Sequence, residues 1–439
     1  SYVPVVDHSR SRIPVAHARR LGDEHPPVAR ALTEPVARSL EYWAATRGGQ
    51  PALFEGAAML TYRDWNDYAD LLADALAGRG LGADDVVAVR CSNRIEWAVI
   101  ALACSKINAR LLMLDPELTP RAMRERLIAG QAAAIIVGDV APVRLAPALE
   151  GLPFKLRATM DGAFPGFFNF WDLFPPVAQP RFGPVQPSLL AWTAGASGRA
   201  MPIGLPHRRA APASASRTPE PESGASLITV QPHRVWGPVQ FWAALTAGRA
   251  IHLVRSFEPA ETLGLIRKRR ITHWSALPES FEQLRELGAE AVRAADTSSL
   301  QELEIGGAPA TPALKAWLAD LFAPILNEAY GSTEAGRIST MPLARRHEKP
   351  ESCGRPVRGV SVEIRDERGQ RLPSGAIGEI WARTPRSLEC DLPASSLRTR
   401  RDADGYVATG DAGRVDDDGF IYITGKAASL HERDMRHAG

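Results

Sequence analysis

The feature that most constrains the fold of this chain is a regular alternation of apolar runs and helical patterns between Leu60 and Val137. The runs VVAVRC, ARLLML and AAAIIVG have the length and apolar character of buried strands. Between them, EWAVIALACSKI and LTPRAMRERLIAG are typical of helices. A further helix is predicted after Thr61, which forms the pattern of a capping box with Asp64. Strands that alternate with helices at this spacing predict a parallel α/β sheet.

A second set of the same kind begins at Ser188. The predicted strands are SLLAW, ASLITV, AIHLV, ITHWSA, LQELEIGG and PILNEAYG, with helical patterns between most of them. We therefore expect a second, mainly parallel sheet, whose last strand runs into the stretch AYGSTEAG, residues 329–336. Ligands of open α/β sheets lie at the carboxyl ends of the strands. This stretch and TAGASGRAMP, residues 193–202, are therefore candidate binding loops.

From Glu351 onward the chain changes to short β segments separated by tight turns such as Asp-Glu-Arg-Gly, Pro-Ser-Gly and DDDG. The predicted fold class is α/β, with two α/β subdomains that have mainly parallel sheets in an αβαβα layering, and a small β-rich, barrel-like subdomain. The predicted division is a basic N-terminal arm at 1–30, α/β subdomains at 31–185 and 186–345, the β-rich subdomain at 346–425 and a tail at 426–439.

The composition is that of a globular protein, and a length of 439 residues predicts two or three subdomains. The net charge of +2 argues against a dedicated nucleic-acid binder, and no apolar run approaches the roughly 20 residues that cross a bilayer. The arm lacks the apolar core of a signal peptide, whereas an organelle transit peptide stays open. The cysteines at 91, 104, 353 and 390 have no metal-ligand spacing. We expect incidental or buried thiols in a reducing compartment, with the cytoplasm as the default.

The stretch AYGSTEAG contains residue types that suit a phosphate and its metal. Gly331 lets backbone N–H groups approach a ligand, and the hydroxyls of Ser332 and Thr333 donate to phosphate oxygens. The carboxylate of Glu334 suits a hard cation. An ordinary polar turn after a buried strand has the same composition, so the rest of the chain has to decide between the two interpretations.

The glycine-rich stretch TAGASGRAMP fits neither the P-loop pattern nor the dinucleotide-binding fingerprint. It is followed by GGAP at 306–309, YGSTE at 330–334 and GYVATGD at 405–411. This order resembles that of the adenylate-forming superfamily, which comprises acyl- and aryl-CoA synthetases, luciferases and peptide-synthetase adenylation domains. The stretches GRP at 354–356 and DDDGFIYITGK also match, and the resemblance extends from about Leu32 to Lys426.

The resemblance implies a role for each motif. Tyr330 would lie against the adenine ring of ATP, Thr333 would reach the α-phosphate, and Glu334 would bind Mg²⁺. Asp411 would accept hydrogen bonds from both ribose hydroxyls, which suits a carboxylate because it only accepts. The loop over the β- and γ-phosphates would comprise Thr193, Gly195, Ser197 and Gly198, and the catalytic set would be Thr193, Ser197, Thr333 and Glu334. The other nucleotide-site residues would be Arg199, Gly306, Gly307, Ala308, Gly331, Ser332, Tyr422 and Lys426.

The reaction implied by the resemblance is activation of a small carboxylic acid. Its carboxylate would attack the α-phosphorus of ATP to give an acyl-adenylate and pyrophosphate, and the acyl group would then pass to a thiol of coenzyme A or of a carrier protein. Gly306 to Ala308 would line the passage between the adenine and the acyl group. The implied protein partner is a carrier protein or a separate C-terminal domain.

The chain also departs from the family pattern at its glycine-rich loop and its acyl gate. Met201 and Ala200 stand where the family has a lysine and the proline before it, so Arg199 either replaces the missing cation or is exposed. In the gate stretch QPHRVWG, residues 231–237, His233 and Arg234 occupy the aromatic and histidine positions. Arg234 either faces the acyl pocket or points outward while Trp236 fills the space.

The end of the chain differs as well. After Gly425 and Lys426, Ser429 replaces the hinge aspartate, so 426–439 is interpreted as a hinge remnant with the C-terminal mobile domain absent. The alternative function is a catalytically impaired nucleotide- or acyl-binding homologue that acts as a partner or regulatory protein. Met201 and the altered gate favour that alternative, whereas the presence of Tyr330, Glu334 and Asp411 together favours an enzyme. A nicotinamide oxidoreductase is disfavoured, because no glycine fingerprint follows VVAVRC.

Overall fold

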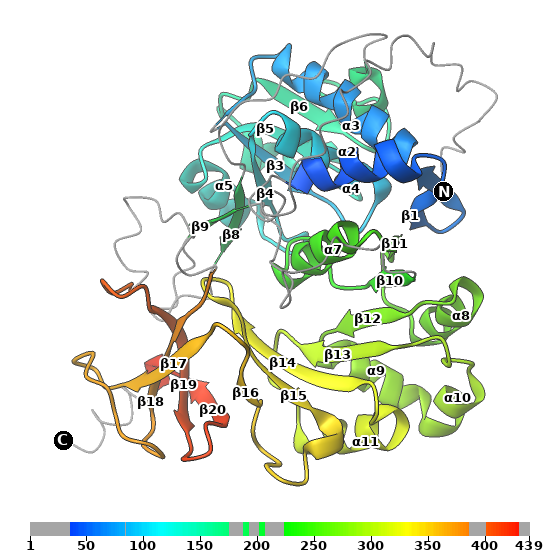
Figure 1. The fold of residues 1–439 in the computed structure, drawn as a ribbon. Coiled ribbons are helices and arrows are strands. Elements are labelled where there is room, and N and C mark those ends of the chain that lie inside the picture. The colour runs from blue at the N-terminus through cyan, green and yellow to red at the C-terminus, as the bar shows by residue number, and fades with distance from the viewer. Residues whose placement is uncertain are drawn as a thin grey trace. The chain divides into compact units, whose positions relative to one another are not determined.

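The computed structural model describes residues 36–83, 85–174, 188–192, 202–206, 224–385 and 401–429 (Figure 1). Two compact units are present. The first contains the described residues up to position 174 together with Phe241–Arg255, and the second contains Gly224–Gln240 and the described residues from Ser256 onward. Phe241–Arg255 groups with the first unit although it lies inside the range expected for the second subdomain. The contiguous boundaries remain predictions. The arm at 1–30 and the glycine-rich loop at 193–201 lie outside the described residues.

The first unit contains the parallel sheet that the sequence predicts. Its strands follow the order β7-β6-β5-β3-β4, and every pairing between them is parallel. Their bounds are β3 Val86–Arg90, β4 Arg110–Met113, β5 Ala132–Val137, β6 Leu156–Thr159 and β7 Phe168–Asn169. The same unit contains β1 (Pro51–Glu55), β2 (Ala58–Thr61) and β11 (Ala250–Leu253), in the order β11-β1-β2.

Three helices of this unit were predicted from the sequence: α3 (Tyr62–Ala77), α4 (Ile95–Lys106) and α5 (Pro120–Ala129). The helices α2 (Val36–Arg47) and α6 (Ala146–Leu149) were not predicted, and short 3₁₀ turns lie at Pro142–Leu145 and Phe170–Leu173. The capping box of α3 is present, because the Thr61 hydroxyl accepts the Asp64 N–H and the Asp64 carboxylate accepts the Thr61 N–H. The aromatic stretch after β6 packs on the unit, since Tyr68 meets Trp171 and Phe174 edge to face.

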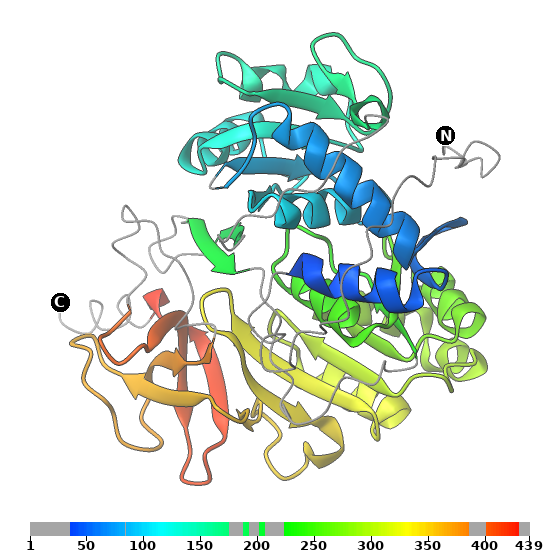
Figure 2. The ribbon, with the colours of Figure 1, turned by 45° about the horizontal axis from the view of Figure 1, so that its top comes forward.

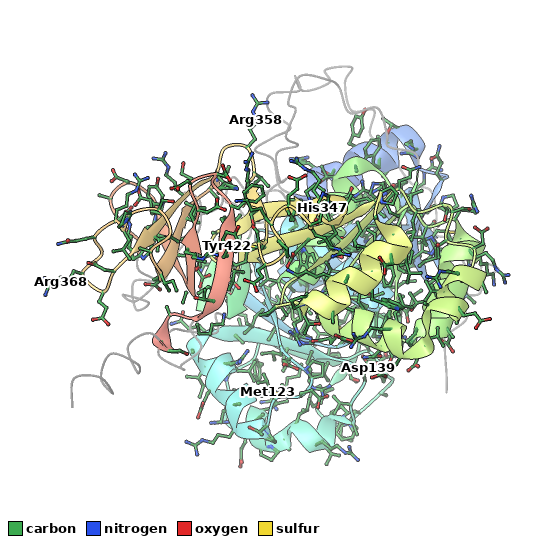
Figure 3. All side chains as sticks on the ribbon, turned by 90° about the horizontal axis from the view of Figure 1, so that it is seen from below. Met123, Asp139, His347, Arg358, Arg368 and Tyr422 are labelled. Atoms are coloured by element: carbon green, nitrogen blue, oxygen red, sulfur yellow. The ribbon has the colours of Figure 1, made fainter. Side chains whose placement is uncertain are left out.

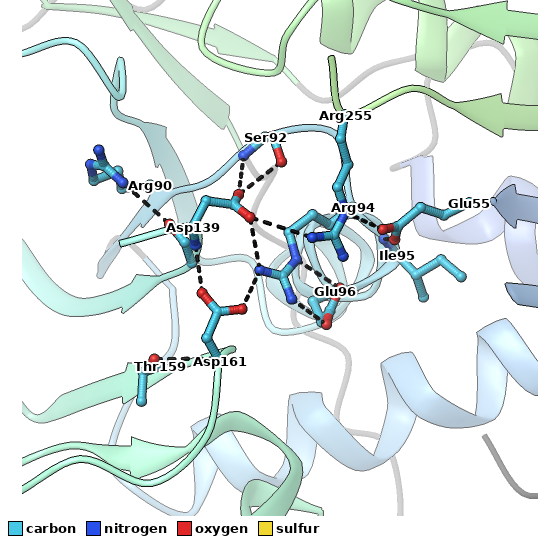
Figure 4. Close-up of polar contacts among 11 residues, drawn as sticks. Glu55, Arg90, Ser92, Arg94, Ile95, Glu96, Asp139, Thr159, Asp161 and Arg255 are labelled. Carbon is cyan, nitrogen blue, oxygen red and sulfur yellow. Dashed lines mark hydrogen bonds and ion pairs between the residues drawn. The ribbon is translucent and has the colours of Figure 1, made fainter. Parts of the chain in front are cut away.

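A buried arginine fixes the carboxyl ends of β3, β5 and β6 (Figure 4). The Arg94 side chain is 3% exposed and donates to Glu96 at 2.8 Å, to Asp161 at 2.6 Å and to Asp139 at 3.2 Å. Asp139 also accepts the backbone N–H and the hydroxyl of Ser92. Burial alone would raise the pKa of Asp139, but the bonds from Ser92 and the charge of Arg94 outweigh it and lower that pKa. One guanidinium therefore ties the start of α4 to the loops after β5 and β6.

Replacing Arg94 with methionine should lower the free energy of unfolding by about 3–5 kcal/mol, because it leaves the buried Glu96 carboxylate without its partner. The lower end of this range is expected, since Asp139 and Asp161 keep 31% and 39% of their side-chain surface exposed. Urea unfolding followed by circular dichroism measures the loss.

The matched control is Arg121→Met. The Arg121 side chain is 90% exposed, and its pair with Glu125 one helical turn away lies in solvent, so its loss should leave stability almost unchanged. Equal losses in the two variants would contradict the structural role of the Arg94 network.

The second unit contains a mixed sheet with the strand order β16-β15-β14-β13-β12-β10. The strands β10 (Ala225–Ile228), β12 (His273–Ala276), β13 (Glu302–Gly306) and β14 (Leu326–Ser332) are parallel, as predicted. The sequence did not predict the antiparallel strands β15 (Gly336–Pro342) and β16 (Arg355–Pro356), which extend the edge. The helices of the second unit are α8 (Pro259–Arg269), α9 (Pro278–Leu287), α10 (Ala289–Ala294) and α11 (Pro312–Phe322). The helix α7 (Trp236–Ala247) begins in the second unit, and its residues from Phe241 onward group with the first. The remaining strands are β8 (Ser188–Trp192) and β9 (Pro202–Pro206).

The predicted β-rich region forms a four-stranded antiparallel sheet, drawn in orange and red in Figure 2. Its strands are β17 (Ser361–Arg365), β18 (Gly378–Arg383), β19 (Val407–Val415) and β20 (Ile421–Lys426), and the order β17-β18-β19-β20 follows the sequence. The DDDG turn joins β19 to β20 as expected, with the Asp416 N–H donating to the Phe420 carbonyl. The barrel-like form is corrected to an open sheet, because β17 to β20 pair in one line among the described residues and the two edge strands do not pair with each other.

Cys91, Cys104 and Cys353 are buried free thiols, which confirms the expectation for three of the four cysteines. Burial raises the pKa of both Cys104 and Cys353 to about 12, so these thiols stay protonated and unreactive at neutral pH. Cys390 lies outside the described residues. None of the helices in the described ranges is both long and apolar enough to cross a membrane.

Candidate functional site

The stretch AYGSTEAG forms the end of β14 and the tip of a hairpin. A turn at residues 333–335 leads from β14 into β15, and the Ser332 hydroxyl accepts the N–H of Ala335 at 3.0 Å. Glu334 is buried at 8% exposure, whereas Thr333 beside it is half-buried. The sequence-based expectation of a strand that ends in a hydroxyl- and carboxylate-bearing turn is confirmed, but the turn reverses the chain rather than starting a crossover.

The motifs YGSTE and GYVATGD, both predicted to bind nucleotide, meet at the carboxylate of Asp411. The Tyr330 hydroxyl on β14 donates to Asp411 Oδ2 at 3.0 Å, although the two residues lie 81 positions apart. Lys426 at the end of β20 donates from Nζ to Asp411 Oδ1 at 2.5 Å. Tyr330 and Asp411 are 7% and 8% exposed. The structure therefore brings Tyr330, Asp411 and Lys426 together, and their roles in nucleotide binding remain predictions.

Glu334 belongs to the same electrostatic environment. Burial raises the pKa of the Glu334 carboxyl, and the negative charge of Asp411 raises it further, whereas Ser332 and Lys426 act in the opposite direction. Burial likewise raises the pKa of the Tyr330 hydroxyl well above its usual value, so Tyr330 stays a hydrogen-bond donor. Two nearby carboxylates, with one of them poorly solvated, form a place that an added cation would stabilise.

A magnesium ion that remains bound to nucleotide phosphates fits this donor set. Mg²⁺ is commonly held by one or two carboxylates together with substrate phosphates, and Glu334 supplies one hard oxygen ligand of that kind. A site made by the protein alone is a poorer match, because no group of three or more His, Cys, Asp or Glu in the described ranges is arranged to hold a metal ion.

Tyr422 does not join this cluster. The hydroxyl of Tyr422 (Figure 3) donates to Asp416 at 2.9 Å, and Arg414 stacks on its ring. Tyr422 is paired with Arg414 and therefore lies nearer the hairpin turn of β19 and β20 than the pair of Lys426 and Asp411 does. Thr193, Gly195, Ser197, Gly198, Arg199 and Met201 lie outside the described residues, so their roles remain predictions.

The gate stretch resolves one of the alternatives that the sequence left open. Arg234 is 49% exposed and pairs with the exposed Glu279 at 3.4 Å, which corrects the assignment of Arg234 to the acyl pocket. A guanidinium keeps its hydration there, which an apolar pocket would remove. Trp236 instead lies against the end of β13, where its ring atoms come within 3.0 Å of the position that a Cβ on Gly306 would take. His233 is half-buried beside this turn.

The sequence analysis did not identify an ion pair on the same sheet. Arg337 on β15 donates to both carboxylate oxygens of Glu304 on β13, at 2.5 and 2.7 Å. Glu304 is 2% exposed, so a buried carboxylate stands two residues before Gly306. The available signal was Glu304 between two apolar residues in ELEIG and Arg337 in GRISTMP, because charged side chains inside buried strands need partners.

A separate cavity of about 650 Å³ lies in the first unit, beside the carboxyl ends of β3, β5 and β6. Its lining includes Arg90, Arg144, Asp139 and Asp161. Both aspartates already accept bonds from Arg94, and Arg90 donates to two backbone carbonyls, so the charges of this cavity are largely satisfied within the protein. Of the two sites, the hairpin of β14 and β15 carries the stronger chemical signal.

Comparison with known proteins decides the family. The model of the family described as "AMP-binding enzyme" matches residues 40–389, which include the hairpin of β14 and β15. The chain belongs to this family of AMP-binding enzymes, the adenylate-forming superfamily. Its fold is that of the large domain of this superfamily.

Individual relatives agree with this family. YdaB of Bacillus subtilis (strain 168) is 30% identical over 394 residues, covering 85% of this chain and 76% of YdaB. 4-Coumarate–CoA ligase 1 of Oryza sativa subsp. japonica is 28% identical over 412 residues, covering 87% and 72% of the two chains. The structure of the amide bond synthetase McbA from Marinactinospora thermotolerans superposes with a TM-score of 0.76 at 27% identity, covering 90% of this chain and 79% of McbA.

Replacing Tyr330 with phenylalanine should lower the free energy of unfolding by about 1.5–3 kcal/mol, the usual range for a hydrogen bond to a charged group. The buried Asp411 loses a donor in this variant. Chemical unfolding of the two proteins measures the difference.

Tyr422→Phe is the matched control, since it also removes a hydroxyl bonded to an aspartate of the same sheet. Tyr422 is half-buried, so water replaces the lost partner and the loss of stability should be smaller. A larger loss for Tyr422→Phe would contradict the importance assigned to the bond between Tyr330 and Asp411.

Proposed function

We propose that this protein activates a small carboxylic acid with ATP, as an acyl- or aryl-CoA synthetase-like ligase. A carboxylate oxygen attacks the α-phosphorus, the bond from that phosphorus to the oxygen that bridges to the β-phosphate breaks, and pyrophosphate leaves. The products are the acyl-adenylate and pyrophosphate. The observation that carries the proposal is the convergence of Tyr330, Glu334, Asp411 and Lys426 at one end of β14, in a chain of the AMP-binding enzyme family.

In this proposal Asp411 binds the ribose. Its two carboxylate oxygens are acceptors, and a pair of neighbouring hydroxyls supplies two donors. Lys426 occupies one of these oxygens in the structure, so the ribose shares or replaces that bond. The Tyr330 hydroxyl holds the other oxygen in place, and the ring of Tyr330 is the proposed neighbour of the adenine.

The phosphates are assigned to the turn after β14. Thr333 is half-buried at its tip and is the proposed donor to the α-phosphate. Glu334 would hold Mg²⁺, which when bound neutralises the negative charge that builds up on the phosphates. The predicted loop with Thr193 and Ser197 would cover the β- and γ-phosphates, with Arg199 as the candidate cation at the place of the missing lysine.

The acceptor of the acyl group belongs to a second step. The names of the relatives give two different acceptors, coenzyme A for 4-coumarate–CoA ligase 1 and an amide-forming nitrogen for McbA. We assign a thiol, of coenzyme A or a carrier protein, to the second step of this chain. The first step, adenylation, is the part that the cluster around Asp411 supports.

Carboxylate-dependent exchange of pyrophosphate into ATP, with Mg²⁺ and a panel of acids, tests the first step. The wild-type protein should support exchange with at least one acid. Glu334→Ala should reduce that exchange by about 100-fold or more, because one ligand of the ion is lost from the site where charge develops. Glu348→Ala is the matched control, since Glu348 forms an exposed pair with Arg345, and exchange should stay at the wild-type rate.

Exchange that survives Glu334→Ala would overturn the metal role of Glu334. No exchange with any acid, together with a rise in melting temperature on adding ATP, would instead support the catalytically impaired binding homologue. A protein that shows neither exchange nor nucleotide binding would contradict both functions.

The rate of exchange should also decrease as the pH is lowered below neutral. Because burial raises the pKa of Glu334, its carboxyl takes up a proton at a higher pH than a free glutamate does. The protonated carboxyl has no charge to offer the ion, so activity is present above this raised pKa and lost as the pH falls through it. A pH profile of exchange at sub-saturating Mg²⁺ checks the prediction, because an excess of the ion would keep the carboxyl deprotonated. A profile that stays flat down to the usual range of a glutamate would contradict it.

A further inference from the structure

The tryptophan at the start of α7 lies directly on the backbone at the end of β13. A Cβ on Gly306 would come within 3.0 Å of Trp236 Cη2, and one on Gly307 within 2.9 Å of Trp236 Cε3. The six-membered part of the indole ring therefore extends along both glycines. On the side of Gly307 the same space is bounded by Leu277, whose Cδ2 lies 2.8 Å from the position of a Cβ there. Any side chain at Gly306 or Gly307 would displace Trp236.

A tight turn holds Trp236 in this position. The Arg234 N–H donates to the Gln231 carbonyl at 3.0 Å, and the Gly237 N–H donates to the Arg234 carbonyl at 2.8 Å. A Cβ on Gly237 would lie 2.6 Å from the Gln231 carbonyl oxygen, so the turn requires glycine at this point. Trp236 is half-buried, so part of its ring remains accessible. One part of the ring therefore lies against Gly306 and Gly307, and another part is accessible.

The floor of the space beside Trp236 is made of small residues. Gly306 is paired with Ala329 on β14, and residues two apart on a strand share a face. Ala329 and Gly331 therefore point to the side of the sheet that Trp236 covers. In the proposed reaction the acyl group lies on this face, because Gly306 to Ala308 are the predicted link between the adenine and the acyl group.

The ion pair of Arg337 and Glu304 closes the same face further along the sheet. Glu304 shares the face of Gly306, two residues before it, and Arg337 reaches it from β15 across β14. Arg337 also donates to Thr340, which is paired with Ala329. A long chain directed toward the start of β14 would have to displace this pair, at the cost of leaving Glu304 buried and unpaired.

On the basis of the proposed adenylation, we infer that Trp236 and the pair of Arg337 and Glu304 restrict the acid to a short acyl group. Trp236 limits the space above Gly306 and Gly307, and the ion pair limits its extension along β14. Long-chain fatty acids are excluded from this site, whereas short straight-chain acids fit against the small residues. Trp236 is therefore the residue that determines chain-length specificity.

Binding of acyl sulfamoyl-adenosines tests this inference without requiring turnover, because these analogues of the acyl-adenylate do not react. Calorimetry with the acetyl, butyryl, octanoyl and palmitoyl compounds should show that the wild-type protein binds the butyryl compound about tenfold or more tightly than the octanoyl one. Trp236→Ala should reverse the order, because octanoyl binding then improves by more than the factor that separates the two compounds in the wild type. Trp236→Leu, which keeps a smaller apolar side chain at this position, should give an intermediate result.

Trp317→Ala is the matched control, since Trp317 is a half-buried tryptophan on α11 of the same unit. It should leave the order of the four compounds unchanged. Wild-type protein that binds octanoyl and butyryl compounds equally, or a Trp317→Ala variant that changes the order as Trp236→Ala does, would overturn the inference. Selective binding without pyrophosphate exchange would uphold the chain-length limit and contradict only the proposed catalysis. Failure to bind any of the compounds would contradict both.

Discussion

The hydrogen bond from Tyr330 to Asp411 is the interaction on which the candidate site depends, because it joins two sheets of different construction. Tyr330 belongs to the mixed sheet of the second unit, and Asp411 belongs to the small antiparallel sheet. The apolar residues around the bond come from both, with Ile338 of β15 in one cluster with Ile380 and Val407. Burial of these side chains holds the sheets together, and the hydrogen bond fixes the position of Tyr330 on one sheet against Asp411 on the other.

Buried charge is used in two different ways in this protein. Arg94 of the first unit forms ion pairs with three carboxylates and so links loops to each other, which makes its role structural. The pair of Arg337 and Glu304 also satisfies a buried carboxylate, but it lies on the sheet face where the proposed substrate binds. The desolvation of Glu304 is offset only while Arg337 stays in place, which makes this part of the face resistant to rearrangement.

Much of the fold follows from local patterns in the sequence. The capping box at Thr61, the buried runs of β3 and β5, and the strand before Tyr330 were all identified because hydrophobic period and turn residues act over a few positions. The antiparallel strand β15 was not identified, because the reversal after Glu334 depends on packing against the small sheet. In the site, motif order predicted that Tyr330 and Asp411 belong together. It did not predict the directions of the Arg234 and Trp236 side chains. Arg234 points outward to pair with the exposed Glu279, and Trp236 lies where Gly306 and Gly307 have no side chains.

Lys426 competes with the ribose of the proposed nucleotide for hydrogen bonds to the Asp411 carboxylate. Its side chain is 66% exposed, so the attraction between the two charges is screened by dissolved ions, whereas hydrogen bonds from neutral ribose hydroxyls are affected much less. Ionic strength therefore changes how strongly Lys426 holds Asp411, rather than how strongly the ribose does. For this part of the proposed site, rising salt would release the lysine and favour the sugar, opposite to its usual effect on binding a polyanion such as ATP.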